Sequence, residues 1–559
     1  MSGVFCVAMP SSRMKYPAPR TSIFAANMVA TSQPLADQAG LRILQHGGNA
    51  IDAAIAMAIT LTVVEPTSNG IGSDAFALFW KSGRLHGMNG SGRSPRAFSR
   101  ELLPDQDRMP VRGWPTVTVP GAVALWRDLH RAHGRFKFEA LFEPAIKYAE
   151  GGFPVSPQTA DDWHRAFKTL SAFDEWRATF APNGRAPRAG ELFVAPRHAD
   201  TLRRIAETEG ESFYTGELAG RIVAASRGAG WVLDHADLAE HATVDAAPLG
   251  MPYRNGCTLW ELPPNGQGIA ALIALGIVRR FDLNEHGPDD ADTLHVQIEA
   301  MKLAFAEAHR SIADPDWMTE DPHALIADAH LDELAAKVDR NRAQDFGHGP
   351  PKPGGTVLLT AADAEGTMVT FIQSNYMGFG SGIVIPDTGI ALQNRGACFT
   401  LEAGHPNEAA GGKRPYQTII PGFITRNEAA TDDRREEVAG DRSEEVAGDQ
   451  QPHLAFGVMG GFMQPQGHLQ MAVRTIDFDQ DPQAALDAPR WQVFEGKRLT
   501  IEAGFPSGAY EELQQRGHAA EVVHERNVSH GGGQAIQRLA NGCYLGASDH
   551  RRDGQAVGY

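Results

Sequence analysis

The chain has 559 residues, of which 42% are hydrophobic and 21% charged, and its formal net charge at pH 7 is −17. This composition is typical of a globular protein with a large core and argues against a mainly disordered chain. The negative charge argues against a nucleic-acid partner, because proteins that bind polyanions gain most of their affinity from Lys and Arg that neutralise phosphates. A small-molecule substrate fits this charge better.

Scattered cysteines and the absence of long apolar runs indicate a protein of a reducing compartment that does not enter a membrane. Cys6, Cys257, Cys398 and Cys543 show neither the CxxC spacing of a zinc site nor the density of a disulfide scaffold. The first twenty residues are interrupted by prolines and contain no continuous apolar stretch, so we expect no secretory signal. No run approaches the ~18 apolar residues of a membrane helix. We therefore expect a cytoplasmic protein without a membrane partner; a periplasmic location is the alternative.

The first predicted elements are two packed helices and a strand. Leu and Ile recur at helical spacing over residues 33–64, with a break at Gly47-Gly48 and a new helix start at Asn49. Glu65-Pro66 ends the second helix, and the apolar residues 75–80 predict a strand.

Helical patterns dominate the middle of the chain, from about residue 122 to residue 280. A further helix is predicted over residues 295–312. It stops before Asp314-Pro315, because the residue before a proline disfavours helical backbone.

The sequence changes character near residue 350. Prolines and glycines crowd residues 350–355, after which residues 356–360 and 368–373 predict two strands joined by a turn at residues 363–366. A flexible segment thus runs directly into a β-hairpin that begins at Thr356.

A charged insertion lies between residues 425 and 451. It contains the sequence EEVAGD twice, at residues 436–441 and 444–449. We predict a surface loop that arose by a small duplication, because the insertion has almost no apolar residues to bury.

Gly354-Gly355-Thr356 suggests a self-cleavage site. There the threonine hydroxyl attacks the preceding carbonyl carbon, and the resulting ester is hydrolysed. Such chemistry needs backbone freedom before the nucleophile and a fixed strand after it, and the two glycines supply the former. The alternative is a flexible linker that enters a strand, which these three residues by themselves favour.

Two other glycine-rich segments suggest parts of a pocket. Residues 378–382 lack the GxGxxG spacing and the P-loop lysine, so they are either a tight turn or a pocket wall and not a nucleotide site. Gly460-Gly461 follows an apolar, strand-like run and is either a tight turn or a pair of amides that forms an oxyanion hole. No HExxH or GxSxG motif occurs, so we expect no metal, no cofactor and no serine-hydrolase elbow.

Taken together, the order and spacing of these segments resemble the γ-glutamyltransferase family over nearly the whole chain. The matching segments are residues 27–36, 47–54, 65–66, 70–72, 119–121, 263–268, 299–305 and 314–315, followed after Thr356 by Asp363, Gly366 and residues 378–382, 389–390, 413–415, 460–461 and 487–490. So many matches in order make self-cleavage the stronger interpretation of Thr356.

The resemblance implies an α/β fold of the α+β kind, the four-layer αββα sandwich of the N-terminal-nucleophile hydrolases. It implies cleavage between Gly355 and Thr356 into a large chain, residues 1–355, and a small chain, residues 356–559, which form one unit as a heterodimer. The free α-amine of Thr356 would act as general base, since its unperturbed pKa near ~7.7–8.0 leaves it partly neutral. Ser374 would support the nucleophile, and Gly460 and Gly461 would supply the oxyanion amides.

The chain departs from the family where the transferases bind the α-amino and α-carboxylate groups of a glutamyl substrate. The residues at those positions are Tyr376, Arg395, Cys398, Gln417 and Thr418. Because Cys398 replaces the usual acidic residue, a substrate ammonium would lose its charged partner in a partly desolvated pocket, at a cost of several kcal/mol. A glutaryl group has no such ammonium. Arg93 lies two positions after the usual carboxylate-binding arginine and is expected to reach the same carboxylate.

These departures are similar to the glutaryl or cephalosporin acylase branch. We predict a self-processing amidohydrolase that cleaves glutaryl or γ-glutamyl amides through an acyl-enzyme on Thr356, with γ-glutamyl transfer as a second activity. One alternative is a glutathione hydrolase or γ-glutamyltransferase. Another is a dicarboxylate-binding protein that never cleaves itself.

Overall fold

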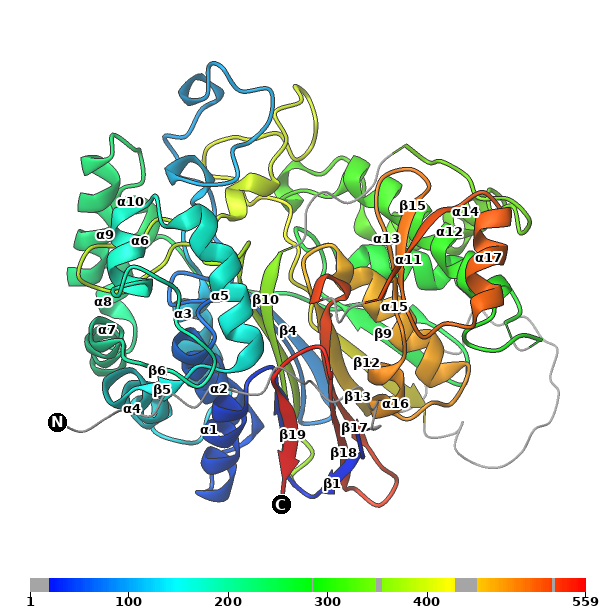
Figure 1. Cartoon of the computed structure of the whole chain (residues 1–559), viewed down its shortest axis with the longest axis horizontal. Helices are drawn as coiled ribbons and strands as arrows, with labels where there is room; N and C mark the ends of the chain where they lie inside the picture. Colours follow the sequence, from blue (N-terminus) through cyan, green and yellow to red (C-terminus); the bar gives the residue numbers. More distant parts are fainter. Residues whose placement is uncertain (1–19, 284, 348–353, 428–449, 525–527) are drawn as a thin grey trace.

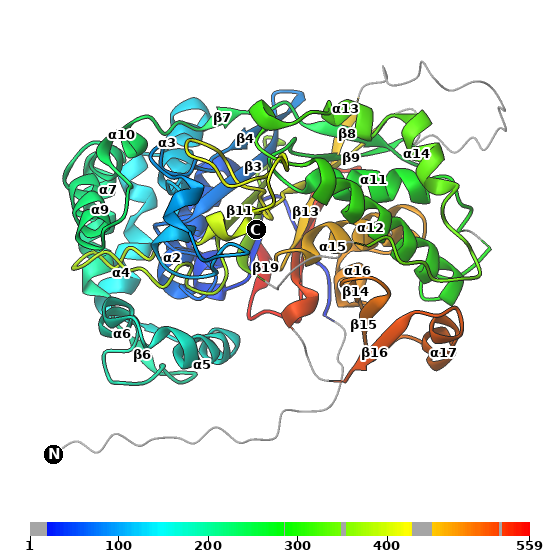
Figure 2. The ribbon, with the colours of Figure 1, turned by 90° about the horizontal axis from the view of Figure 1, so that it is seen from above.

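The structure is a computed structural model and describes residues 20–283, 285–347, 354–427, 450–524 and 528–559. Within these ranges two seven-stranded antiparallel sheets stack face to face, and helices cover the outer face of each (Figures 1 and 2). This arrangement confirms the predicted αββα sandwich. Both copies of EEVAGD, and Cys6, lie outside the described residues.

The first sheet contains the predicted hairpin. In spatial order its strands are β19 (Gln555–Gly558), β2 (Met28–Thr31), β10 (Gly355–Ala362), β11 (Met368–Tyr376), β3 (Asp74–Lys81), β4 (Arg84–Asn89) and β7 (Val244–Asp245). The β10–β11 turn is tied to the adjacent helix layer, because the Asp363 carboxylate accepts a 2.9 Å hydrogen bond from the Ala50 amide. The hairpin is therefore fixed at its turn end.

The second sheet faces the first. In spatial order its strands are β1 (Ile23–Ala25), β18 (Tyr544–Ser548), β17 (Gly532–Arg538), β13 (Gln450–Met459), β12 (Gly422–Asn427), β9 (Cys257–Glu261) and β8 (Leu249–Pro252). The prediction of mainly helical structure over residues 122–280 missed β8 and β9. Both are short, and β9 is buried on both faces, so it lacks the alternation of apolar and polar residues that indicates a strand.

Helices on the outer face of the first sheet come from the first half of the chain. They are α1 (Pro34–Gln45), α2 (Ala50–Val64), α3 (Ala122–His133), α4 (Glu143–Gly151), α5 (Pro157–Leu170), α6 (Asp174–Phe180), α7 (Pro196–Glu207), α8 (Glu211–Tyr214), α9 (Glu217–Gly228) and α10 (His235–Ala239), with the small strand pair β5 (Phe153–Pro154) and β6 (Leu192–Phe193). The predicted helix pair is confirmed as α1 and α2. Every residue of α2 is buried, which explains its apolar sequence.

Helices on the other side come from both halves of the chain. They are α11 (Gly268–Val278), α12 (Ala291–Ser311), α13 (Pro322–Leu325), α14 (Asp328–Ala335), α15 (Met463–Ile476), α16 (Pro482–Asp487) and α17 (Ser507–Gln515). A three-stranded sheet of β14 (Trp491–Val493), β15 (Arg498–Glu502) and β16 (Ala519–Val523) packs beside them. The predicted helix over residues 295–312 is confirmed as most of α12.

Strands from before and after residue 355 are combined within both sheets. In the first sheet β10 pairs with β2 and β11 pairs with β3; in the second, β12 pairs with β9. Between the sheets lies an apolar cluster that includes Phe76, Leu358, Phe423 and Ile536, all fully buried. The two segments on either side of residue 355 therefore share one core.

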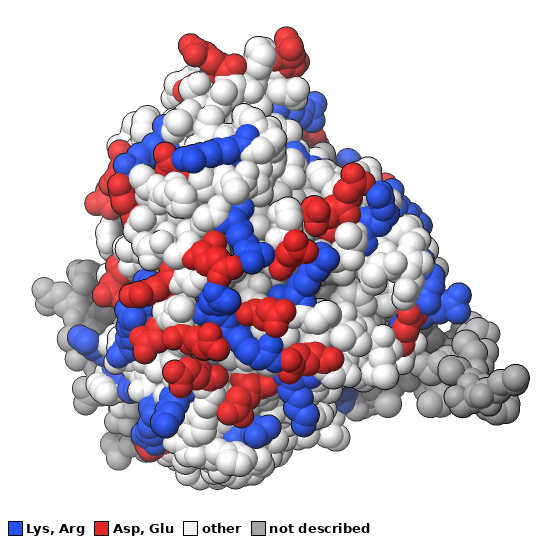
Figure 3. Space-filling view, turned by 90° about the vertical axis from the view of Figure 1, so that its left-hand side faces the viewer, with Lys and Arg blue, Asp and Glu red and all other residues white. Residues whose placement is uncertain are grey.

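The outer face of the first helix layer carries interspersed charges of both signs (Figure 3). Many of them pair, for example Arg221 and Arg204 with Glu217. This face offers no continuous basic surface of the kind that binds nucleic acid. None of the helices in the described ranges combines the length and apolarity needed to cross a membrane.

Candidate active site

Thr356 lies at an irregularity in the β10–β11 pair. Gly355 pairs with Tyr376, whereas Val357 pairs with Gln373, so the register shifts by one residue at Thr356. Such bulges re-aim a side chain and are common beside active sites. The Thr356 side chain is fully buried, and its hydroxyl donates a 3.1 Å hydrogen bond to Ser374 Oγ.

The Ser374 hydroxyl joins the candidate nucleophile to the peptide bond before it. Ser374 Oγ donates a 2.8 Å hydrogen bond to the Gly355 carbonyl oxygen and accepts a 2.8 Å hydrogen bond from the Tyr376 amide. The attacking oxygen and the carbonyl that it would attack thus contact the same hydroxyl. A donor on the carbonyl oxygen draws electron density from its carbon, which favours attack by a nearby hydroxyl.

The Gly460-Gly461 turn lies against this cluster. A Cβ at Gly354 would come within 2.6 Å of the Tyr376 carbonyl oxygen and 3.4 Å of the Gly461 Cα, so only glycine fits before the nucleophile. Gly460 and Gly461 have φ values of +132° and +62°, which favour glycine. Among the described residues, neither amide N–H has a backbone or side-chain acceptor, whereas buried amides are nearly always paired. The turn leads into α15, whose N-terminus adds positive potential.

The Arg395 guanidinium places a positive charge next to the Ser374 hydroxyl. It lies in the short 3-10 turn Arg395–Cys398 and is fully buried. Its Nη1 donates a 2.6 Å hydrogen bond to Thr418 Oγ1, and its Nη2 lies 3.5 Å from Ser374 Oγ. The guanidinium stacks 4.6 Å from the centre of the Tyr376 ring, and Nε has no hydrogen-bond partner among the described residues. A buried cation with spare donors is a site for an anionic group.

Tyr376 has a strained backbone that helps hold this cation. Its φ of +71° lies in the left-handed region, which non-glycine residues rarely adopt. Such strain persists only where the surroundings over-determine it, and it gathers at functional sites. Here the Tyr376 amide bonds to Ser374 and the ring faces Arg395.

Asp74 is a buried carboxyl that sequence reasoning missed. It begins β3 and lies opposite Ser374 in the β3–β11 pairing. Its Oδ2 accepts a 2.9 Å hydrogen bond from Gln417 Nε2. Burial raises the pKa of Asp74 to about 6, against the opposing charge of Arg395. A polar residue at the start of an otherwise apolar strand is the signal that could have identified it.

Cys398 faces a large cavity. This cavity of about 850 Å³ is also lined by Tyr376, Tyr416, Phe462 and Gly347. Burial raises the pKa of the Cys398 thiol, although the nearby Arg395 opposes this, so the thiol is neutral at ordinary pH. The position that the family resemblance assigns to the substrate ammonium is therefore uncharged here.

The structure thus brings together all but one of the predicted site residues. The residues linked by these contacts are Gly355, Thr356, Ser374, Tyr376, Arg395, Cys398, Gln417, Thr418, Gly460 and Gly461. Arg93 is engaged elsewhere, because its Nη1 lies 2.6 Å from Asp314 and its Nη2 3.2 Å from Asp316. Gln267 was also missed: its Nε2 donates hydrogen bonds to the carbonyls of Thr418 and Gly461, at 2.6 and 2.9 Å.

One buried group of metal-type ligands lies on the α12 side of the molecule. Ligand atoms of His295, Glu299 and His518 lie within 4.8 Å of one another. However, the Lys302 ammonium lies 2.5 Å from Glu299 Oε1 and balances its charge. A cation at that position would be repelled, so we assign no metal to this cluster.

Asp74 allows a test of the site's electrostatics. Burial raises the pKa of Asp74 in the folded protein to about 6, from the ordinary 3.8. The protonated carboxyl therefore stabilises the folded state below pH 3.8, and this stabilisation is lost as the pH rises through about 6. We expect the free energy of unfolding of the wild type to fall relative to Asp74→Asn between about pH 4 and pH 7, by roughly 3 kcal/mol. Denaturant unfolding across this range measures the difference; a constant difference would contradict a titrating, buried Asp74.

Comparison with known proteins agrees with this geometry. The sequence profile of the family described as gamma-glutamyltranspeptidase matches residues 36–432 and 445–559. A crystal structure of a cephalosporin acylase from Bacillus halodurans covers 99% of both chains, with 46% identity and a TM-score of 0.91. The glutathione hydrolase-like YwrD proenzyme of Bacillus subtilis and the oxamate amidohydrolase proenzyme of Klebsiella pneumoniae are each 33% identical, over 96% of this chain and 99% of their own length. The chain is thus an amide hydrolase that belongs to the γ-glutamyltranspeptidase family.

Proposed function

We propose that this chain is a precursor that cleaves itself between Gly355 and Thr356 and then hydrolyses small amides through an acyl-enzyme on Thr356. The observation that carries the proposal is the Ser374 hydroxyl, which bonds both to the Thr356 hydroxyl and to the Gly355 carbonyl. The large chain, residues 1–355, and the small chain, residues 356–559, then remain together as a heterodimer. Their shared sheets support this association.

Maturation follows from the contacts at the peptide bond. Thr356 Oγ1 attacks the Gly355 carbonyl carbon and gives up its hydroxyl proton, the bond from that carbon to the Thr356 nitrogen breaks, and the proton passes to that nitrogen, which leaves as the amine. Water then hydrolyses the ester and releases the Gly355 carboxylate. Gly354 and Gly355 permit the backbone rotation that this attack requires, since neither has a Cβ.

Turnover uses the same oxygen. The freed α-amine of Thr356 takes the proton of its own hydroxyl as Oγ1 attacks the substrate carbonyl, and then gives that proton to the leaving amine. The amides of Gly460 and Gly461 donate to the oxyanion. Water completes hydrolysis of the ester; an amine in its place gives transfer.

The neutral Cys398 supports acyl groups without an α-amine. A γ-glutamyl ammonium finds no carboxylate at this position, whereas a glutaryl group has nothing to pair there. The likeness to a cephalosporin acylase from Bacillus halodurans supports the acylase type of activity. Glutaryl amides are therefore the leading substrate class, and γ-glutamyl amides the second.

A shorter acyl group is a further candidate, and Arg395 supports it. Its Nη2 lies 3.5 Å from Ser374 Oγ, which itself lies 3.1 Å from Thr356 Oγ1. A carboxylate bonded directly to the scissile carbonyl would reach Arg395 while the carbonyl carbon lies about 3 Å from the nucleophile. Glutaryl instead places three methylenes between these groups. The 33% identical relative named oxamate amidohydrolase supports monoamides of short diacids as this candidate.

Self-cleavage is tested by the size and first residue of the small chain. We expect purified wild-type protein to contain two chains, the smaller beginning at Thr356, and Thr356→Ala to yield a folded, uncut and inactive precursor. Denaturing gels with N-terminal sequencing measure both. Thr356→Ser keeps the hydroxyl and is the matched control that should still cleave. Cleavage that persisted in Thr356→Ala, or a small chain that began elsewhere, would rule out this nucleophile.

Cys398 is tested by the ratio of two substrates. We expect wild-type enzyme to cleave glutaryl-anilide at least as well as γ-glutamyl-anilide. Cys398→Asp should shift the ratio of kcat/KM values toward γ-glutamyl-anilide by about 10-fold, because it restores a charged partner for the ammonium. Cys398→Ser is the matched control, since it adds no charge. A strong wild-type preference for γ-glutamyl-anilide would instead favour a transferase.

Arg395 is tested with substrates of different acyl length. We expect Arg395→Gln to lower kcat/KM for oxamate by on the order of 10²-fold, because a buried carboxylate loses its charged partner. The loss for glutaryl-anilide should be smaller if its carboxylate lies beyond Arg395, and equal if Arg395 anchors both. Arg93→Ala, compared on the same substrates, tells the two arginines apart. A larger loss in Arg93→Ala than in Arg395→Gln would restore Arg93 as the anchor.

A further inference from the structure

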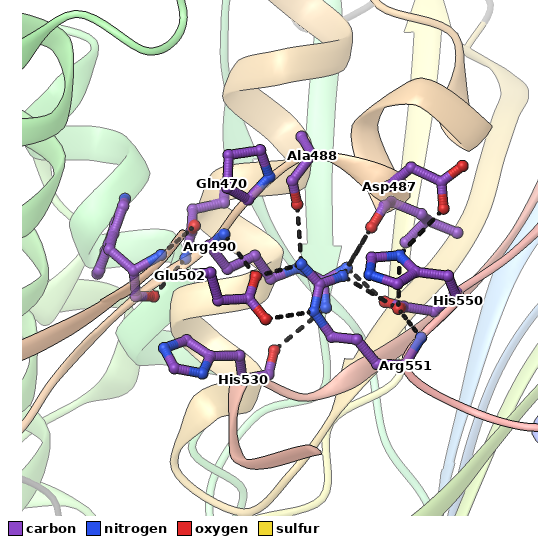
Figure 4. Close-up of polar contacts among 12 residues, drawn as sticks. Gln470, Asp487, Ala488, Arg490, Glu502, His530, His550 and Arg551 are labelled. Atoms are coloured by element: carbon purple, nitrogen blue, oxygen red, sulfur yellow. Dashed lines mark hydrogen bonds and ion pairs between the residues drawn. The ribbon is translucent and has the colours of Figure 1, made fainter. Parts of the chain in front are cut away.

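A buried network of four charged side chains lies beside the second sheet (Figure 4). Arg490 Nη2 lies 2.7 Å from Asp549 Oδ2, and Arg551 Nη1 lies 3.0 Å from Asp549 Oδ1. Arg551 Nε donates a 2.8 Å hydrogen bond to Glu502 Oε1. The charges of the two guanidiniums, Arg490 and Arg551, thus balance those of the two carboxylates, Asp549 and Glu502. Although burial raises the pKa of Asp549, the two guanidiniums lower it overall, so it stays ionised.

The network joins segments that are distant in sequence. Arg551 donates to the carbonyls of Leu486 and Ala488, each at 2.9 Å, and the Arg490 amide donates a 2.9 Å hydrogen bond to Glu502. These bonds tie the turn before β19 to the ends of α16 and β15. The reaction described above uses none of these residues.

The same network holds both ends of a short segment, residues 530–533, which joins the 3-10 turn Val528–His530 to the start of β17. Arg490 Nη1 donates a 3.1 Å hydrogen bond to the His530 carbonyl, and Asp549 Oδ2 accepts a 2.9 Å hydrogen bond from the Gly533 amide. Figure 4 shows the His530 carbonyl pointing toward the guanidiniums. The Arg490–Asp549 ion pair therefore bonds to both ends of residues 530–533.

Gly531, in the middle of this segment, packs directly against the turn at Gly460. A Cβ at Gly460 would come within 3.2 Å of the Gly531 Cα, and a Cβ at Gly531 within 2.6 Å of the Met459 carbonyl oxygen. Backbone thus lies directly against backbone here, and the side chains of Val458 and Met463 pack at the same contact. A displacement of residues 530–533 would therefore press on the backbone that carries the amides of Gly460 and Gly461.

Energetics also favours a geometric role for the network. A buried ion pair contributes little net stability compared with apolar residues of the same shape, because desolvation offsets the attraction. Its directional bonds, however, fix positions closely. Amides that stabilise an oxyanion act only when they are held close to the developing charge, and a misplacement of about 1 Å can cost on the order of 10²-fold in rate.

We propose that Arg490, together with Asp549, is a positioning residue that acts through residues 530–533 to hold the Gly460-Gly461 amides toward the oxyanion. This inference rests on the proposed function, in which those amides stabilise the tetrahedral intermediate. Arg490 itself touches neither the substrate nor Thr356 in this arrangement. Its loss should affect the transition state more than the bound ground state.

The test variant is Arg490→Lys. It keeps a cation opposite Asp549, but one ammonium cannot reproduce both the Asp549 pair and the bond to the His530 carbonyl. Asp549→Asn is the second variant, which removes the charge that orients Arg490. The matched control is Arg254→Lys: Arg254 pairs with the buried Asp477 and lies 3.4 Å from the Val278 carbonyl. Asp477 follows the C-terminus of α15, about 20 Å from the Gly460 end.

The readout compares two ligands of the matured enzyme, 4-boronobutanoate and glutarate. In the boronate, boron takes the place of the glutaryl carbonyl carbon; Thr356 Oγ1 bonds to it, its proton passes to the α-amine, and an anionic tetrahedral adduct forms. Glutarate binds without an adduct. We expect Arg490→Lys and Asp549→Asn to weaken the boronate at least 10-fold more than glutarate and to lower kcat more than they raise KM. Arg254→Lys should lower the thermal midpoint and leave the ligand ratio unchanged.

The possible results distinguish failure of the proposed function from failure of the positioning role of Arg490. If wild-type enzyme binds the boronate no better than glutarate, the proposed glutaryl acyl-enzyme on Thr356 is wrong, and the positioning role that rests on it falls as well. If wild type shows the preference and both Arg490→Lys and Asp549→Asn retain it, only the positioning role is overturned. A loss of thermal midpoint without a change in the ratio likewise reduces the network to a structural one.

Discussion

One hydrogen-bond cluster sets the rest of the active site: the Ser374 hydroxyl contacts both the hydroxyl of Thr356 and the carbonyl of Gly355. The β10–β11 register shifts by one residue at Thr356, and the Thr356 hydroxyl there reaches the same Ser374 hydroxyl that bonds to the preceding carbonyl. Every other part of the site is arranged around this contact. The glycines before Thr356 leave room for it, and the Tyr376 amide fixes Ser374 from the other side.

The charge distribution around that cluster is unusual for a buried pocket. Arg395 is fully buried beside a thiol that burial keeps neutral and a carboxyl, Asp74, whose pKa burial raises. The pocket therefore offers a cation that is only partly compensated. A substrate carboxylate would complete it, which is why the proposed substrates carry one. The length of the acyl group then depends on how far that carboxylate lies from the scissile carbonyl.

The surrounding fold explains how a chain with a proposed break at residue 355 remains one molecule. Strands from both sides of the break pair with each other in both sheets, and the apolar cluster between the sheets draws on both. Separation would expose that core to water and break the backbone ladders together. The buried charge network around Arg490 and Asp549 lies beside the second sheet, and residues 530–533 connect it to the glycine turn that packs against Gly354.

Local sequence patterns were sufficient to predict several helices and the start of the central hairpin. Apolar spacing predicted α1, α2 and most of α12, because it reports which face of a helix is buried. The crowding of glycine and proline before residue 356 predicted the start of β10, because these residues interrupt regular structure. Resemblance to a family predicted the αββα layers and nearly all the residues that meet around Thr356. β8 and β9, the burial of Asp74, and the engagement of Arg93 with Asp314 and Asp316 were not predictable in this way. These features arise from contacts between residues far apart in the sequence, and only the folded chain decides which charge is buried, which is paired, and which is left to meet a substrate.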